Sequence, residues 1–376
     1  MKIAVPTERR EHERRVALTP DAVTRLTGQG IEVLVHAGAG AAASLPDAAY
    51  QDAGARIVAD EAELLAQADA LVTVGHPEDG WIDGLRNGAV LVGLFQPLSN
   101  RDLVDRLAGA GLTAFSLDAI PRITRSQSMD ALSSQATVSG YKAVLIAAGH
   151  VPRFFPMLIT AAGTIPPAKV LVLGAGVAGL QAIATARRLG AVVSAFDTRP
   201  VVKEQVRSLG ATFVELELEV EEGQDARGYA TELSEAQHAQ EQALVQRSVT
   251  ESDVVITTAL IPGRPAPELI TASAVEGMRP GSVIVDLAAE AGGNCQLTSP
   301  GEVIVHNGVT IVGTLNLPST MPLHASQMFA RNITSLLDLI TADGEQAIDF
   351  EDEIVADACI THDGRVVSRL LQGAAA

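Results

Sequence analysis

Residues 169–199, KVLVLGAGVAGLQAIATARRLGAVVSAFDTR, constrain the fold of this chain more than any other stretch. A short apolar run leads into Gly174-x-Gly176-x-x-Gly179, a helical pattern follows, and a second apolar run ends at Asp197. Gly174 suits a tight turn, Gly176 lets backbone N–H groups approach a pyrophosphate, and Gly179 permits close packing of the helix on the strand. This order of elements predicts a Rossmann-like βαβ unit that binds a dinucleotide.

The residues at the end of the second run indicate which dinucleotide is bound. Asp197 lies about 20 residues beyond the glycines, where a carboxylate accepts hydrogen bonds from the adenosine ribose hydroxyls. A carboxylate there would repel a 2′-phosphate, so the sequence favours NAD(H) over NADP(H). Val177, Ala178 and Thr198 complete the predicted site. Arg199 is close enough either to pair with Asp197 or to meet a phosphate, and both roles remain open.

Strand-like and helix-like runs alternate along almost the whole chain. Hydrophobic residues make up 47% of the 376 residues and aromatic residues only 3%, a composition typical of parallel sheets covered by helices. The predicted strands are 2–5, 31–36, 70–74, 89–95, 112–118, 169–173, 253–260 and 282–290, with two short candidates after them. Helical patterns cover 19–30, 60–68, 99–111, 135–149 and 318–340. We therefore expect an α/β protein with two Rossmann-like, doubly wound parallel-sheet domains.

The helical pattern at 318–340 bears on the domain boundaries. If this helix returns the chain to the first domain, that domain is discontinuous and comprises residues 1–134 plus 325–376. The NAD(H)-binding domain then covers 135–324. The most apolar long stretch, 143–163, contains His150, Arg153 and two prolines. We expect it to form two buried helices broken at Pro152, and not a membrane span.

Charge and cysteine content exclude several classes of function. The formal net charge is −18, which argues against a nucleic-acid partner because binding phosphates needs a basic face. The two cysteines, Cys295 and Cys359, cannot form a disulfide framework, and the N-terminal residues lack the apolar region of a signal peptide. No spacing of histidines or cysteines suggests a metal site. A reduced, cytoplasmic setting is expected.

Two further loops follow predicted strands and should line the cofactor crevice. They are ALIPGRPAPELIT at 259–271, which contains Gly263, and DLAAEAGGNCQLT at 286–298, which contains Asn294. Loops at the carboxyl ends of the strands surround the ligand in doubly wound sheets. Asn294 suits either a contact with the nicotinamide or a turn after Gly293, and the sequence does not decide between them.

A polar segment, RITRSQSMDALSS at 122–134, separates the two apolar halves of the chain. It is either an exposed linker or part of a site. Linkers are usually rich in Gly, Pro, Glu or Lys, whereas this segment carries amide, carboxylate and guanidinium groups. Gln127 offers both a donor and an acceptor, which matches a carboxamide, and Asp130 and Ser133 suit ribose hydroxyls. Arg122 and Arg125 suit a carbonyl or a phosphate.

The pattern R-x-x-R-x-Q-S-M-D-x-L-S-S resembles the loop of the NAD(H)-binding component of proton-translocating nicotinamide nucleotide transhydrogenase. The resemblance extends over nearly the whole chain and includes RVALTP at 15–20, VDLAAEAGGNC at 285–295 and PSTMPLHAS at 318–326. It implies that nicotinamide-positioning roles fall on Arg122, Gln127, Asp130 and Ser133, and that Tyr141 supports that segment. It also implies that Tyr229, in a Gly-Tyr-Ala context within 215–236, belongs to a mobile loop that closes over the nucleotide.

Alanine dehydrogenase is similar to this family and is the main alternative. Oxidising an amine moves a proton, so such an enzyme needs an acid/base group beside the nicotinamide. The positions that carry its lysine and histidine correspond here to Gly75 and Gln96, while Arg15 is shared by both families. His76 lies next to Gly75 and is a weak candidate for a base. A nucleotide-binding module without catalysis is the third possibility.

The resemblance further implies an enzyme that transfers hydride from NADH to NADP⁺ held by a partner component, coupled to proton translocation. The expected partners are a membrane-embedded component, an NADP(H)-binding domain and a second copy of this chain. Its expected location is the cytoplasmic side of the inner membrane, held there through the partner subunits. Hydride transfer between two nicotinamides needs orientation and exclusion of water, and no proton acceptor on the protein.

Overall fold

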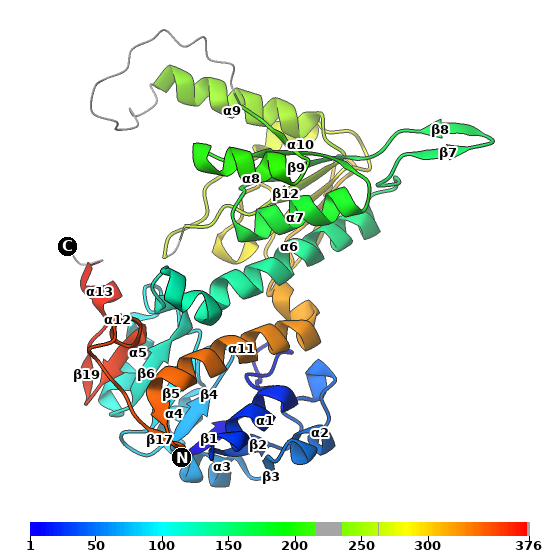
Figure 1. Cartoon of the computed structure of the whole chain (residues 1–376). Coiled ribbons are helices and arrows are strands. Elements are labelled where there is room, and N and C mark those ends of the chain that lie inside the picture. The colour runs from blue at the N-terminus through cyan, green and yellow to red at the C-terminus, as the bar shows by residue number, and fades with distance from the viewer. Residues whose placement is uncertain (216–234, 262, 374–376) are drawn as a thin grey trace. The chain divides into compact units, whose positions relative to one another are not determined.

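The chain divides into two compact units in the computed structural model, which describes residues 1–215, 235–261 and 263–373 (Figure 1). Unit 1 comprises Met1–Ala136 and Pro318–Ala376, and unit 2 comprises Thr137–Leu317. Unit 1 is therefore built from two stretches of chain. The long helix α11 (Pro322–Ile340) belongs to it.

The sheet of unit 1 has eight strands in the order β19-β18-β6-β5-β4-β1-β2-β3. The strands are β1 (Lys2–Val5), β2 (Glu32–His36), β3 (Arg56–Val58), β4 (Ala70–Val72), β5 (Val90–Gly93), β6 (Thr113–Ser116), β18 (Cys359–His362) and β19 (Arg365–Val366). Strands β1 to β6 pair in parallel, and β18 joins β6 antiparallel. The chain order reverses between β1 and β4, which is the topological switch point where doubly wound sheets bind ligands.

Helices cover both faces of this sheet because alternate strand residues point to opposite cores. Ile3 and Val5 pack with α1 (Pro20–Gly28) and α11, whereas Ala4 packs with α3 (Glu61–Gln67), α4 (Asp79–Gly84) and α5 (Arg101–Gly109). The remaining elements of unit 1 are α2 (Asp47–Asp52), α12 (Glu353–Ala358), α13 (Arg369–Gly373), the 3₁₀ turns η1 (Ala41–Ala43), η2 (Leu117–Ala119) and η3 (Thr124–Met129), and the ribbon β16 (Thr341–Ala342) with β17 (Glu345–Gln346). The 3₁₀ turn η6 (Leu317–Thr320) falls at the boundary of the units.

Unit 2 repeats the same topology with a seven-stranded sheet in the order β11-β10-β9-β12-β13-β15-β14. Its strands are β9 (Lys169–Leu173), β10 (Val192–Phe196), β11 (Thr212–Phe213), β12 (Val254–Thr257), β13 (Val283–Asp286), β14 (Val303–His306) and β15 (Val309–Val312). Its helices are α6 (Ala131–His150, which begins in unit 1), α7 (Val177–Arg188), α8 (Lys203–Ser208), α9 (Glu235–Thr250) and α10 (Ala272–Glu276), with 3₁₀ turns η4 (Pro200–Val202) and η5 (Ala289–Ala291). Val170 packs with α6 and α7, and Leu171 packs with α9 and α10 on the other face.

The expected fold class of two doubly wound α/β domains is confirmed, with differences in detail. The sheets are not purely parallel, because β14 in unit 2 and β18 and β19 in unit 1 run antiparallel at sheet edges. Strand β3 was not anticipated. It is only three residues long and its first residue is exposed, so it shows little periodicity.

The expectation of two buried helices in 143–163 is wrong for the second half of that stretch. Helix α6 ends at His150, and residues beyond Pro152 lead into a hairpin of β7 (Leu158–Thr160) and β8 (Gly163–Ile165). Gly163 has φ of 118°, which no helix permits. The hairpin is exposed and projects from the rest of unit 2 in Figure 1. No helix among the described residues is long and apolar enough to cross a bilayer.

Candidate nucleotide and nicotinamide sites

The glycine-rich turn of unit 2 joins β9 to α7 and leaves backbone donors exposed to a ligand. Gly174 has φ of 95°, a left-handed conformation that favours glycine. Gly176 is the residue before the helix and supplies no side-chain cap, so the first N–H groups of α7, at Val177 and Ala178, have no intrahelical acceptor. Such donors at a helix N-terminus bind phosphate groups.

Gly179 and Gly140 let backbones approach closely within unit 2. A Cβ added at Gly179 would overlap the carbonyl oxygen of Gly174, and one added at Gly140 of α6 would overlap the carbonyl oxygen of Ala178. The turn is thus packed tightly by its own helix and by α6. A side chain at either position would fill the cradle that the turn forms, so the residues present fit a pyrophosphate.

Asp197 follows β10 and is held by four hydrogen bonds. Its Oδ2 accepts from the Ala175 N–H (2.7 Å) and from Arg199 Nη2 (2.9 Å), while its Oδ1 accepts from the Arg199 N–H (2.8 Å) and from Arg199 Nε (2.9 Å). Burial pushes the pKa of Asp197 upward, but the Arg199 guanidinium and the backbone donors outweigh it and leave that pKa below its ordinary value. Asp197 is therefore ionised, as an acceptor for ribose hydroxyls must be.

The remaining predicted cofactor residues take different environments. Thr198 is exposed beside Asp197, and Gly263 has φ of 70° in the loop after β12. Tyr229 lies outside the described residues.

Asn294 is fully buried and braces that loop. Its Oδ1 accepts from the Ala259 N–H (3.0 Å), and its Nδ2 donates to the carbonyl oxygens of Ala259 (2.9 Å) and Pro267 (2.8 Å). Asp286 in turn accepts the Asn294 N–H (2.7 Å). The geometry gives Asn294 the positioning of the 259–267 loop, in place of the direct nicotinamide contact that was one of two expected roles.

The polar segment of unit 1 is folded, and it ends in a helix cap. Residues Thr124–Met129 form η3, and Asp130 precedes α6. Asp130 Oδ1 accepts the Ser133 N–H (2.8 Å), and Oδ2 accepts the Ser133 hydroxyl (2.5 Å). This is the geometry of an N-cap. Arg122 and Gln127 are exposed on the same segment, and neither side chain bonds to any described residue.

Three contacts anchor this segment from the far end of the chain, and sequence analysis missed them. Arg125 forms a bidentate pair with Asp352 (2.5 and 2.9 Å), which raises the pKa of Arg125 and lowers that of Asp352. Asn332 of α11 donates to the carbonyl oxygen of Ser128 (2.8 Å) and accepts from Ser134 (2.6 Å). Because Arg125 is engaged by Asp352, Arg122 is the arginine of the segment that remains available for a ligand.

The positions of the alanine dehydrogenase lysine and histidine look quite different here. Gly75 follows β4, and a Cβ added there would overlap the guanidinium of Arg10. Gln96 has φ of 48° and its N–H donates to Asp118. His76 Nε2 lies 3.2 Å from Asn100 Nδ2, and burial lowers the pKa of His76, as does Arg10. A neutral histidine held by an amide is not placed as an acid.

A second group of charges surrounds the switch point of unit 1. Glu13 takes both ends of the Arg15 guanidinium, with Arg15 Nη2 2.7 Å from Oε2, and Arg15 Nη1 donates to Gln135 Oε1 (2.9 Å). Glu8 accepts the Val74 N–H (2.6 Å). Burial raises the pKa of Glu8 to about 7, with the Val74 N–H opposing that rise.

Comparisons with known proteins match both units. Residues 4–139 match the family "Alanine dehydrogenase/PNT, N-terminal domain", and residues 143–369 match "Alanine dehydrogenase/PNT, C-terminal domain". The chain belongs to the alanine dehydrogenase/PNT family. It is 48% identical to the first of the polypeptides that make up NAD(P) transhydrogenase subunit alpha in Rhodospirillum rubrum, over 99% of both chains.

The family has two branches, and identity separates them. A solved transhydrogenase from Sinorhizobium meliloti superposes with a TM-score of 0.85 at 43% identity, covering 98% of this chain and 100% of that one. Alanine dehydrogenase of Mycobacterium tuberculosis is 30% identical, over 98% of this chain and 95% of its own length. The expected resemblance to transhydrogenase alpha subunits and the enzyme class are confirmed, and NAD(H) binding is supported by the same matches.

Proposed function

We propose that this chain is the NAD(H)-binding component of a proton-translocating transhydrogenase. It binds NADH in unit 2 and delivers a hydride to NADP⁺ held by a partner component. The overall reaction is NADH + NADP⁺ ⇌ NAD⁺ + NADPH, in which one hydride leaves one nicotinamide and joins the other. An amino acid dehydrogenase of the alanine type remains the rival.

The observation that carries this choice is the guanidinium of Arg10 lying where a side chain at Gly75 would begin. An amine oxidation must place a proton donor or acceptor beside the reacting carbon. Here one of the two family positions is glycine under an arginine and the other is an amide, Gln96. Hydride exchange between nicotinamides leaves no proton to be moved, so such a pocket loses nothing by lacking that pair.

The chain's own residues then have tasks of binding and orientation. The first N–H groups of α7 bind the pyrophosphate, and Asp197 accepts the adenosine ribose hydroxyls. Gln127 hydrogen-bonds the carboxamide and fixes the rotation of the ring, with Arg122 at the carbonyl. Asp130 and Ser133 contact the neighbouring ribose while they continue to cap α6. Tyr141, on α6, supports this arrangement.

The partners follow from the same proposal. A membrane-embedded component and an NADP(H)-binding domain complete the enzyme and hold this chain at the cytoplasmic side of the inner membrane. A second copy of the chain binds through the β7–β8 hairpin, where Met157 is 56% exposed and Ile159 is 76% exposed. Apolar side chains so exposed on a hairpin are typical of an interface.

The test mixes the purified chain with a transhydrogenase NADP(H)-binding domain and follows hydride transfer from NADPH to an NAD⁺ analogue with a shifted absorbance. Rapid transfer that depends on both proteins is expected. A parallel assay supplies the chain alone with NADH, pyruvate and ammonia. NADH oxidation in that assay, with no transfer in the first, would establish the alanine dehydrogenase activity instead. NADH binding without activity in either assay would indicate a nucleotide-binding module.

A further inference from the structure

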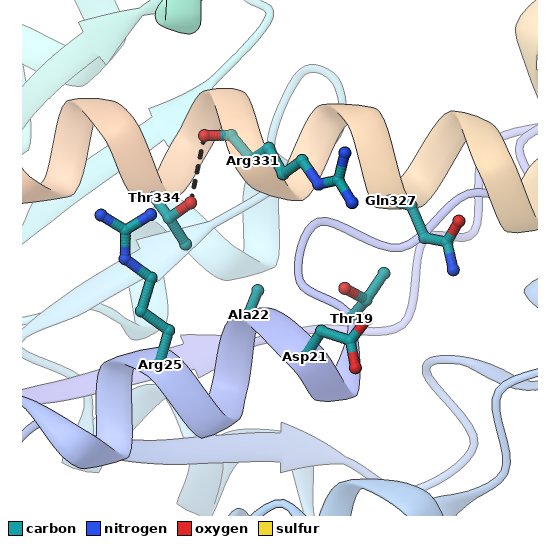
Figure 2. Close-up of a pocket in the computed structure, with 7 residues that line it drawn as sticks. All are labelled: Thr19, Asp21, Ala22, Arg25, Gln327, Arg331 and Thr334. Atoms are coloured by element: carbon teal, nitrogen blue, oxygen red, sulfur yellow. Dashed lines mark hydrogen bonds between the residues drawn. The ribbon is translucent and has the colours of Figure 1, made fainter.

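A cavity of about 180 Å³ in unit 1 lies between α1 and α11, away from every residue assigned above. It is lined by Thr19, Asp21, Ala22 and Arg25 from the α1 side and by Gln327, Arg331 and Thr334 from α11. Figure 2 shows Arg331 and Gln327 extending from α11 toward the first turn of α1, and Arg25 extending from α1 toward α11. One water takes about 30 Å³ of liquid volume, so the cavity holds a small ligand with some of its water.

The donors that line this cavity are not used by the protein. Thr19 precedes α1 at the N-cap position, is only 4% exposed, and its hydroxyl makes no hydrogen bond to any described residue. Side chains at this position usually accept from the first turn of the helix. Because Thr19 does not do so, the N–H groups of Asp21 and Ala22 also lack an intrahelical acceptor.

The charges of the cavity favour an anion. Arg331 is exposed and forms no ion pair or side-chain hydrogen bond within the described part of the chain. Arg25 is paired with Asp338, and Asp21 is the one acidic side chain among the seven that line the cavity. A guanidinium, an amide, a buried hydroxyl and two N–H groups at the start of a nine-residue helix make a set dominated by donors.

We propose that this cavity binds a small tetrahedral oxyanion such as inorganic phosphate or the phosphate group of a small metabolite. Arg331 supplies charge-assisted hydrogen bonds, the Thr19 hydroxyl and the first N–H groups of α1 bind the oxygens below it, and Gln327 closes the side. Several oxygens with several lone pairs are needed to satisfy these donors together. A carboxylate has two oxygens and satisfies fewer of them.

The probe for this site is inorganic phosphate, titrated calorimetrically into the full chain at constant ionic strength. Saturating NADH is present so that the pyrophosphate site of unit 2 is occupied. Three variants are compared. Arg331→Gln removes the charge, Thr19→Val removes the hydroxyl while keeping the shape, and Arg101→Gln is the control. Arg101 is an exposed arginine of α5 that forms no ion pair with the described residues.

Saturable binding of phosphate is expected, weakened about tenfold in Arg331→Gln, since charge-assisted bonds are the strong ones. In Thr19→Val it should weaken about threefold to tenfold. Arg101→Gln should bind as the unmodified chain does, and acetate should bind at least tenfold more weakly than phosphate. The proposal is overturned if no saturable binding occurs, if both cavity variants bind normally, or if acetate binds as tightly as phosphate.

Discussion

Arg199 clasps the carboxylate of Asp197, with Nε 2.9 Å from Oδ1 and Nη2 2.9 Å from Oδ2. Together with the backbone N–H groups of Ala175 and Arg199, these bonds occupy about all four lone-pair sites of the carboxylate. A ribose hydroxyl therefore cannot bind Asp197 unless a bond from the Arg199 side chain is given up. Nucleotide binding and release of the Arg199 side chain are coupled at this position.

Removing that competitor should strengthen nucleotide binding. We expect Arg199→Gln to bind NADH about twofold to fivefold more tightly, because Asp197 then keeps its backbone donors and offers its outer lone pairs to the ribose. Asp197→Asn should weaken binding about tenfold or more. Both are measured by titration of NADH fluorescence. Weaker binding by Arg199→Gln would show that the guanidinium itself contacts the nucleotide.

Gln127 should govern the rate of hydride transfer more than affinity. Shortening the side chain in Gln127→Asn moves the amide away from the carboxamide, so the ring loses its orientation, and we expect turnover to fall by about 100-fold. NADH affinity should stay within a few-fold, because the pyrophosphate and adenosine contacts lie in unit 2. The measurement is single-turnover transfer with the partner domain.

The control for Gln127→Asn is Gln67→Asn, the same shortening on α3. It should leave turnover unchanged. Equal turnover in Gln127→Asn and the unmodified chain would remove Gln127 from the site.

The close approach at Gly179 should not tolerate a methyl group. In Gly179→Ala the Cβ meets the backbone carbonyl of Gly174, which cannot turn aside, so α7 must move away from β9. We expect a loss of about 1–3 kcal/mol in stability and about tenfold in NADH affinity. Gly149→Ala near the end of α6 meets nothing and should stabilise by about 0.5–1 kcal/mol. Urea unfolding of the two variants should therefore shift in opposite directions.

Glu8 should make stability fall as the pH rises toward neutrality. Its pKa is raised from 4.5 to about 7, so the folded chain binds a proton that the unfolded chain has lost. Stability is thus highest below the unfolded pKa, declines between the two values, and levels off above the folded one. Glu8→Gln keeps an acceptor for Val74 and removes the charge.

In Glu8→Gln the slope of stability between pH 5 and pH 7.5 should flatten, with a gain of about 1–2 kcal/mol at pH 8 after discounting for solvent screening. Unfolding midpoints in urea across this pH range provide the measurement. The same slope in both proteins would show that Glu8 is ionised throughout.

The hairpin should control self-association. Ile159→Asp places a charge on its most exposed apolar side chain, and we expect the dimer to dissociate at least about tenfold more readily in sedimentation velocity. Val305 on β14 is similarly exposed, at 69%, and Val305→Asp is the matched control. Dissociation by the Val305 variant alone would place the interface at the edge of the sheet and not at the hairpin.

Local patterns predicted the parts of the molecule that depend on near neighbours. The turn at Gly174, the packing of Gly179 and the placement of Asp197 follow from one continuous βαβ unit, in which connectivity leaves few arrangements. Strands β18 and β19 escaped prediction because they are short and the second is charged and exposed, so the periodicity is weak. The pairs that anchor the polar segment were equally hidden, since Arg125 and Asp352 are 227 residues apart.

The packing of Arg10 over Gly75 lay beyond prediction for a different reason. It depends on how the loop after β1 folds back across the loop after β4, and neither loop carries a periodic pattern. The substitution of the lysine position by glycine was visible in the sequence. What fills the vacated space was not.

The split composition of unit 1 sets an order on its synthesis. Residues 137–317 are consecutive, so unit 2 has its whole core once that stretch has left the ribosome. Strand β6 remains an open edge until Cys359–His362 emerges, and Phe329 and Ile333 of α11 are missing from the first core until their own stretch is made. The unit whose earliest residues are translated first is therefore the unit that folds last.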